Sequence, residues 1–318
     1  MHGQGKKTTM SGLSRRLATK SVFSDQEPQE ISKDGLARTW ITRGGNFAVC
    51  VSEVKSGAVL ARDNNPEEYM VILPPGGASI AIEAGGQTVD AEPESLTIVP
   101  PGQSRVVARS AGKVARIFSK ASTDIMALAV NASVYADGAP ELAAPDLWPA
   151  PVGGFKLRHY PLAQYLDPKG DRIQPRCFRS TNMMVNLFGQ FFTRRPTNSL
   201  SPHWHDDFEQ GSLCFEGTWV HHMRYNWGAD MSSWVPDDHA EMGTPSVVII
   251  PAYAIHTSRC IGTDGPSSSL YDIFCPPRMD FASKKGFVIN EDEYPLPVVE
   301  GEHKVKTGGT LLSWQKPG

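Results

Sequence analysis

The sequence predicts an all-β protein made of many short strands joined by tight turns. The 318 residues include 29 Gly and 25 Pro, and these turn-forming residues are spread along the whole chain. Between them lie short runs of alternating apolar and polar residues, which is the pattern of half-buried strands. The length suffices for two domains of typical size, so we expect two sets of strands.

The first set of strands is expected within residues 31–135, after a polar and flexible N-terminal arm over residues 1–30. A short helix is expected over residues 122–135, and paired glycines at positions 76–77 and 85–86 mark turns. The runs that predict strands in this half are Phe47–Val54, Tyr69–Leu73, Ala78–Glu83, Leu96–Pro100 and Val114–Phe118.

A Pro-, Ala- and Gly-rich stretch over residues 136–155 is typical of an exposed linker. The second domain is expected over residues 156–285. Residues 286–318 form a tail that we expect to pack back across a barrel or a partner subunit and then fray. The strand-like runs of the second half are Lys156–Pro161, Asn182–Phe188, Gly211–Phe215, Thr218–Tyr225, Ser246–Ile250, His256–Cys260 and Ser268–Phe274.

Charge and composition exclude several classes of protein. The net charge of −3 provides no basic field for a nucleic acid, and no apolar run approaches the roughly 20 residues that span a bilayer. The five cysteines are scattered without a C-x-x-C pair, as is typical of reduced thiols, and no secretory signal is expected. Phosphate-loop, dinucleotide-binding and serine-esterase motifs are also missing. We therefore expect a cytoplasmic protein that binds neither nucleic acid nor membrane.

Three histidines and a carboxylate form the strongest candidate site. His203 and His205 are one residue apart and share one face of an extended strand, and Glu209 can reach the same point. His256 would arrive from a different strand. Three imidazoles and one carboxylate suit one divalent transition metal per chain, with iron the first expectation and manganese, zinc, nickel or copper also compatible. An octahedral metal would then keep two positions open.

The fourth ligand has two candidates, the adjacent residues Glu209 and Gln210. Glu209 is favoured because it shares its strand face with the apolar residues Leu213 and Phe215, and because a carboxylate neutralises more metal charge than an amide. If Gln210 is the ligand instead, the site contains three histidines and a weak amide oxygen.

Residues 180–275 resemble the cupin superfamily, whose first motif is approximately G-x5-H-x-H-x3-4-E-x6-G and whose second is G-x5-P-x-G-x2-H-x3-N. His203, His205 and Glu209 match the first motif, and His256 matches the histidine of the second. Three departures occur in the second motif: Tyr253 stands at its middle glycine, Cys260 stands at its asparagine, and seven residues separate Gly243 from Pro251. The resemblance implies a bicupin, which has two tandem jelly-roll (double-stranded β-helix) barrels.

The first half contains a weaker copy of the same pattern. The segment Glu68–Leu73 resembles the strand that follows the first motif, and residues 96–105 match the second motif with Arg105 in place of its histidine. No H-x-H precedes Glu67. We therefore expect a degenerate first barrel that has lost its metal.

Three further residues are candidates for catalysis. Arg224 and His222 share a strand face, and if that face points inward Arg224 could hold a substrate carboxylate through its guanidinium. His221 points to the opposite face, so at most one of the two adjacent histidines faces the pocket. Tyr253 lies within the second motif, and its hydroxyl could bind substrate at the mouth of the barrel.

Three functions are compatible with these residues. The first is a non-haem metal dioxygenase, with iron, that acts on an aromatic or enolisable small molecule. The second is a metal-dependent isomerase, lyase or decarboxylase of a sugar acid or oxo acid, and the third is a non-catalytic binding protein. Barrels of this kind pair through exposed sheet edges, so we expect a homodimer.

Overall fold

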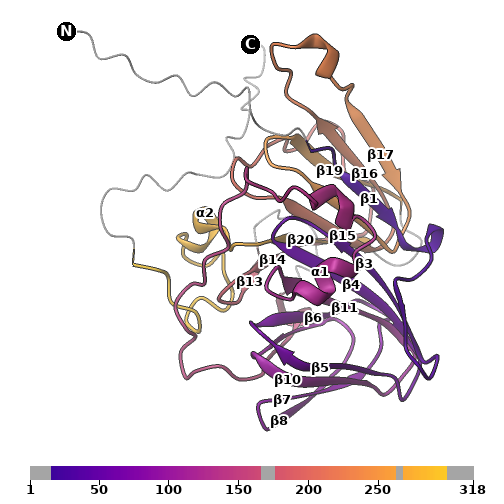
Figure 1. The fold of residues 1–318 in the computed structure, drawn as a ribbon, viewed down its shortest axis with the longest axis vertical. Helices are drawn as coiled ribbons and strands as arrows, with labels where there is room; N and C mark the ends of the chain where they lie inside the picture. Colours follow the sequence, from indigo (N-terminus) through magenta and orange to yellow (C-terminus); the bar gives the residue numbers. More distant parts are fainter. Residues whose placement is uncertain (1–15, 166–175, 263–267, 299–318) are drawn as a thin grey trace.

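The computed structural model describes residues 16–165, 176–262 and 268–298, which form two β-barrels (Figure 1). All pairings between the named strands are antiparallel. The all-β prediction and the tandem-barrel prediction are therefore confirmed. No helix in this described part of the chain is long and apolar enough to cross a membrane.

The first barrel combines a seven-stranded sheet with a four-stranded sheet. The strands of the larger sheet, in spatial order, are β12 (Arg158–Pro161), β9 (Ser95–Val99), β6 (Tyr69–Leu73), β11 (Gly112–Ser119), β4 (Phe47–Val54), β3 (Ala37–Arg43) and β2 (Glu30–Ile31). Those of the smaller sheet are β5 (Val59–Asn65), β10 (Gly102–Ala108), β7 (Ile80–Ala84) and β8 (Gln87–Ala91).

The second barrel combines a six-stranded sheet with a three-stranded sheet. The larger sheet contains β1 (Thr19–Val22), β18 (Ser246–Ile250), β15 (Gln210–Glu216), β20 (Ser268–Phe274), β14 (Met184–Phe191) and β13 (Cys177–Arg179). The smaller sheet contains β17 (Asp238–Met242), β16 (Thr218–Arg224) and β19 (Ile255–Gly262).

Helical segments are short and lie between the sheets or at their ends. They are α1 (Thr123–Leu128), α2 (Met279–Ala282), and the 3-10 turns η1 (Phe23–Asp25), η2 (Ala132–Tyr135), η3 (Leu162–Tyr165) and η4 (Met231–Ser233). The helix expected over residues 122–135 is thus divided into α1 and η2, because Ala129 leaves the helical conformation.

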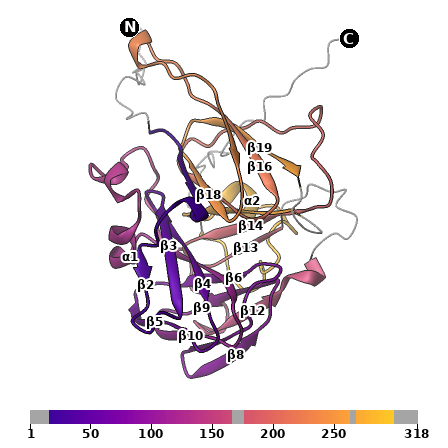
Figure 2. The ribbon, with the colours of Figure 1, turned by 90° about the vertical axis from the view of Figure 1, so that its right-hand side faces the viewer.

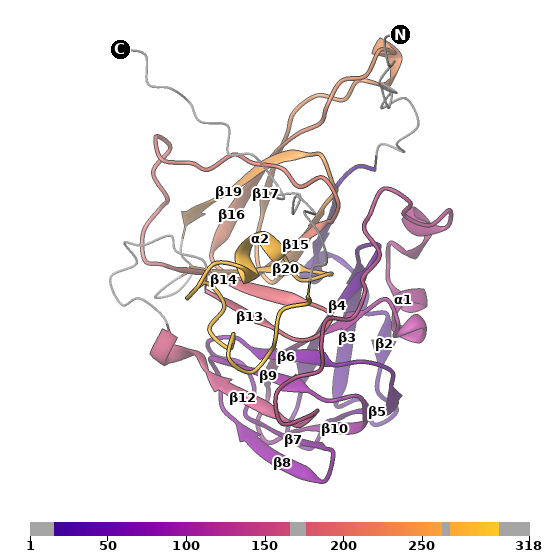
Figure 3. The ribbon, with the colours of Figure 1, turned by 90° about the vertical axis from the view of Figure 1, so that its left-hand side faces the viewer.

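The two large sheets pack face to face, so their central strands are buried on both sides (Figure 3). In β18, Val247 and Ile249 enter the core shared by the two halves, whereas Val248 and Ile250 face the interior of their own barrel. Because both faces of such a strand are covered, it appears in the sequence as a continuous apolar run rather than an alternating one.

Each half contributes a strand to the other half. β1 pairs with β18 of the second barrel, and β12 pairs with β9 of the first (Figure 2). Residues 19–22 were expected in a flexible arm and residues 158–161 in the second barrel, so the structure corrects both boundaries. The rest of the expected arm, residues 1–15, and the end of the tail, residues 299–318, lie outside the described residues.

Two buried glutamates repeat this reciprocal arrangement. Glu68, just before β6, accepts hydrogen bonds from the Thr181 backbone N–H (2.9 Å) and the Tyr294 hydroxyl (2.9 Å). Glu209, just before β15, accepts them from the Gly45 backbone N–H (2.6 Å) and the Tyr135 hydroxyl (3.0 Å). Each glutamate therefore ties its own barrel to a turn of the other barrel.

Candidate metal centre

Three histidines converge inside the second barrel. His203 and His256 form an isolated antiparallel bridge, with backbone N···O distances of 3.1 and 2.8 Å. His205 lies two residues further along, and candidate ligand atoms of the three imidazoles lie within 4.8 Å of one another. Among the described residues, these three are the one group of His, Cys, Asp or Glu side chains gathered in this way.

Backbone carbonyls fix the orientation of two of the rings. Nδ1 of His203 lies 2.9 Å from the Ser201 carbonyl oxygen, and Nδ1 of His256 lies 2.9 Å from that of Ala254. A carbonyl only accepts hydrogen bonds, so each Nδ1 carries the proton and each Nε2 keeps a free lone pair. This is the tautomer in which Nε2 can bind a metal.

Burial keeps these imidazoles neutral. It lowers the pKa of His203, and it lowers the pKa values of His205 and His256 well below the ordinary value of 6.5. Neighbouring positive charge, including that of Arg278, lowers all three further. Because a metal binds the neutral imidazole, little proton release would accompany binding at neutral pH.

Gln210 is the fourth residue at this point. Its side-chain oxygen lies 3.1 Å from Nε2 of His205 and 3.3 Å from Nε2 of His256. Its amide nitrogen donates to Ser212 (3.0 Å) and to Asp272 (2.9 Å), and these contacts turn the oxygen toward the histidines. The structure thus brings Gln210 to the three imidazoles.

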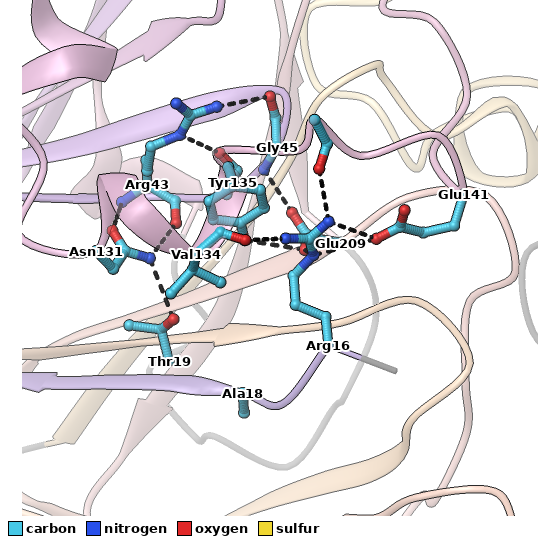
Figure 4. A network of polar contacts seen from close by, with 12 residues as sticks. Arg16, Ala18, Thr19, Arg43, Gly45, Asn131, Val134, Tyr135, Glu141 and Glu209 are labelled. Atoms are coloured by element: carbon cyan, nitrogen blue, oxygen red, sulfur yellow. Dashed lines mark hydrogen bonds and ion pairs between the residues drawn. The ribbon is translucent and has the colours of Figure 1, made fainter. Parts of the chain in front are cut away.

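Glu209 lies outside the histidine cluster, which corrects the expectation that favoured it. Its carboxylate points into the interface between the two halves, toward Gly45 and Tyr135, and one of its oxygens lies 3.8 Å from Nε of Arg16 (Figure 4). The physical reason is strand alternation: adjacent residues face opposite sides, and the side opposite the barrel interior is the shared core rather than solvent. The parity argument from Leu213 and Phe215 was wrong because those two residues also belong to the shared core.

The polar support beneath Gln210 was not identified from the sequence. Ser212 also donates to Asp272 (2.9 Å), and burial raises the pKa of Asp272 to about 7. Arg278 lies close enough to influence the three histidines, and its guanidinium pairs with Asp280 at 3.0 and 2.6 Å. Asp272 follows the alternation of a recognisable strand and could have been assigned to the interior, whereas Arg278 follows the last strand and carried no signal.

Of the expected catalytic residues, His222 and Arg224 lie away from the histidine cluster. Arg224 is exposed and forms a bidentate pair with Asp237. His222 is half-buried, and its Nδ1 lies 2.9 Å from Nδ1 of His239 on the neighbouring strand. Their face of β16 therefore points outward.

His221 occupies the inward face of β16 instead. It is 1% exposed, and its Nδ1 lies 2.8 Å from the Ser258 hydroxyl. No hydrogen-bond partner meets its Nε2 in the described part of the chain. Burial lowers the pKa of His221 to about 4, and its ring is close enough to influence His256. Of the adjacent histidines, His221 is therefore the one that lies near the cluster.

Tyr253 lies in the loop that leads to His256. Its backbone has a φ of 66°, in the left-handed region that glycine adopts most easily, and its N–H donates to the His205 carbonyl (2.6 Å). Gly102 occupies the corresponding position of the first barrel with a φ of 103°. This conformation explains why a glycine is expected at this point of the motif. The Tyr253 ring is half-buried, and burial raises its pKa.

The corresponding corner of the first barrel has different residues. Arg105, expected in place of the motif histidine, is exposed and lies 3.9 Å from Glu83. Ser104 points inward instead and bonds to the Tyr69 hydroxyl at 2.9 Å. Tyr69 occupies the position that Gln210 has in the second barrel. In the strand register Tyr69 lies opposite Val99 and Gln210 lies opposite Ile250, and both Val99 and Ile250 are followed by a proline.

Comparisons with solved structures identify the fold. Protein YlbA from Escherichia coli matches with a TM-score of 0.51 and 11% identity, over 83% of this chain and 93% of that one. AerE from Microcystis aeruginosa matches with a TM-score of 0.50 and 8% identity, over 78% and 97% of the two chains. A mutant of Bacillus subtilis oxalate decarboxylase matches with a TM-score of 0.50 and 14% identity, over 85% and 79%. No protein-family model and no curated protein matches the sequence. These likenesses show a shared fold, that of two tandem cupin barrels.

Proposed function

We propose that this tandem cupin chain is a metal-dependent enzyme that acts on a small anionic organic substrate in its second barrel. His203, His205 and His256 would hold one divalent transition metal, with the amide oxygen of Gln210 as a weak fourth ligand. The observation that carries the proposal is the convergence of three buried, neutral imidazoles, with their candidate ligand atoms within 4.8 Å of one another.

The three imidazoles and the amide oxygen fit such an ion, and their lack of charge favours an anionic substrate. All four donors are neutral, so a bound divalent ion would keep its full charge, and the nearby Arg278 is itself paired with Asp280. An anionic molecule that chelates through oxygen, such as an enolate, a catecholate or an oxo acid, would offset that charge. When bound, the metal would supply Lewis acidity and, if redox-active, reactivity toward dioxygen.

This chain's own residues would supply the rest of the site. Asp272 and Ser212 would hold the Gln210 amide in its orientation. His221 would present its Nε2, which meets no hydrogen-bond partner among the described residues, to a substrate group inside the barrel. Buried apolar side chains, including Phe208 and Phe274, would exclude water from one side of the cluster.

For the reaction, we propose dioxygenation of an aromatic or enolisable compound. Decarboxylation or isomerisation of an oxo acid is the second candidate, and the structural likeness to oxalate decarboxylase favours it. The two differ in their need for oxygen. Turnover of a catechol, hydroxybenzoate or diketone that stops under nitrogen would support dioxygenation, whereas turnover of an oxo acid that persists under nitrogen would support the second candidate.

The test of the whole proposal combines metal content with turnover. We expect His256→Ala to lose both, whereas His159→Gln, a change at a half-buried histidine of the first half, should keep both. A folded His256→Ala variant that retained one equivalent of metal would contradict the assignment.

A further inference from the structure

The interior of the first barrel contains a buried cation that has no ionic partner in the part of the chain that the structure describes. Arg116 lies on β11, is 4% exposed, and points to the same side as Val114 and Phe118, which belong to the apolar core of this barrel. Its neighbours across the sheet are Cys50 on β4 and Val71 on β6. The side chains directly across the sheet from it are therefore uncharged. The Arg62–Asp124 ion pair lies nearby, with the Arg62 guanidinium carbon 5.3 Å from the centre of the Phe118 ring.

No carboxylate of the described residues pairs with Arg116, and its Nε is enclosed without a hydrogen-bond partner. The other buried or largely buried arginines have defined partners: Arg179 and Arg195 donate to backbone carbonyl oxygens, and three more pair with carboxylates. Arg62 pairs with Asp124, Arg158 with Glu293, and Arg278 with Asp280. Arg116 instead lies near an aromatic surface, with its guanidinium carbon 5.5 Å from the centre of the Phe118 ring.

The surrounding groups cannot supply the missing negative charge. Burial raises the pKa of the Cys50 thiol to about 12, so it stays neutral. Burial also raises the pKa of Tyr69, whose ring stacks on Phe118 and whose hydroxyl bonds to Ser104. An arginine does not lose its proton in a protein, and a buried ion without a counter-charge is strongly unfavourable.

The second barrel has an acidic residue at the same position. Asp272 lies opposite Asn186 and Ser212 on the two neighbouring strands, and Arg116 lies opposite Cys50 and Val71 in the same way. Ser212 and Val71 correspond because each comes two residues after the matched pair Gln210 and Tyr69. In the second half this carboxyl group holds Gln210 at the candidate metal centre. The first half has neither the histidine cluster nor a protein anion there among its described residues, but it has a guanidinium.

We propose that the first barrel binds a small monocarboxylate through Arg116. The guanidinium fork matches the two oxygens of a carboxylate, which would supply the missing charge and hydrogen-bond acceptors. The neighbouring Phe118 and Val71 surfaces would accept an apolar group such as a methyl. Acetate is a small monocarboxylate with one methyl group and therefore serves as the probe.

The test is thermal unfolding of the full chain in a bulky sulfonate buffer of constant ionic strength, with acetate or chloride added. A ligand of the native state raises the unfolding midpoint with its concentration, so acetate should raise that of the wild type. Arg116→Met should abolish the acetate-dependent rise. Without acetate its midpoint should equal or exceed that of the wild type, because the unpaired charge is gone. Arg105→Gln removes an exposed arginine and should respond like the wild type.

If Arg116→Met does not fold, two other experiments test the proposal. They are thermal unfolding of Arg116→Lys with acetate and a calorimetric titration of the wild type with acetate. The lysine keeps the charge and loses the fork, so a weakened acetate response is expected. A wild type that is insensitive to acetate, or sensitive only to chloride, would overturn the proposal. A response that survives in Arg116→Met and disappears in His256→Ala would overturn it too, because the acetate would then lie at the metal centre.

Discussion

The contacts of Glu209 predict that its replacement destabilises the fold without removing the metal. Its carboxylate is 2% exposed and accepts from the Gly45 N–H at 2.6 Å and the Tyr135 hydroxyl at 3.0 Å. Glu209→Ala would leave both donors buried without partners, at about 1–3 kcal/mol each, so we expect a loss of about 3–5 kcal/mol in the free energy of unfolding. Glu209→Gln keeps the shape, but its amide nitrogen cannot accept a hydrogen bond. Its oxygen can still accept from the Gly45 N–H, while the Tyr135 hydroxyl must turn to accept from the amide, so we expect a loss of about 1–2 kcal/mol.

Denaturant unfolding and metal analysis of the same samples measure the two effects. Glu68→Gln is a matched control, because Glu68 makes the corresponding contacts to Thr181 and Tyr294 in the other half. We expect both glutamine variants to lose similar stability and to retain the metal of the wild type. A Glu209→Gln variant with unchanged stability and no metal would refute this reasoning and restore Glu209 as a ligand.

Two further predictions concern surface groups and pH. Arg224→Ala and His222→Gln should leave metal content and turnover unchanged, because both side chains lie on the outer face of β16. His221→Gln should lower turnover while the metal is retained. A loss of turnover in Arg224→Ala would contradict the outward orientation of that face. Burial lowers the pKa of His159 below 6.5, so the unfolded chain binds this proton more tightly than the folded chain. Stability should therefore fall as the pH drops below about 6.5, and less so in His159→Gln; equal pH dependence of the two unfolding free energies would contradict this.

Many strand positions could be predicted from the sequence, but β3, β5, β8, β10 and β17 match none of the expected runs. Phe47–Val54, Tyr69–Leu73, Ser246–Ile250 and Ser268–Phe274 are strands with the expected bounds. Such runs are recognisable because they combine β-branched residues with flanking Gly and Pro, which are local properties. The exchange of β1 and β12 between the halves could not be predicted, because which strand pairs with which depends on tertiary contacts.

The three histidines were identified from their spacing, but the neighbouring residues were not assigned correctly. Choosing between Glu209 and Gln210 requires knowing what each face of β15 contacts, and here both faces are buried. The internal repeat carried a usable signal, since Glu68 precedes Tyr69 as Glu209 precedes Gln210. A glutamate conserved between the two halves, one of which lacks the histidines, suits a role in their interface better than a role as a ligand.

The central claim is that His203, His205 and His256, with Gln210, form a metal centre. Elemental analysis per chain of the wild type, His256→Ala, Gln210→Ala and Glu209→Gln tests it most directly. We predict one equivalent of a divalent transition metal in the wild type, none in His256→Ala, weakened retention in Gln210→Ala and full retention in Glu209→Gln. A wild type that binds no metal after reconstitution with iron, manganese, zinc, nickel or copper would contradict the account.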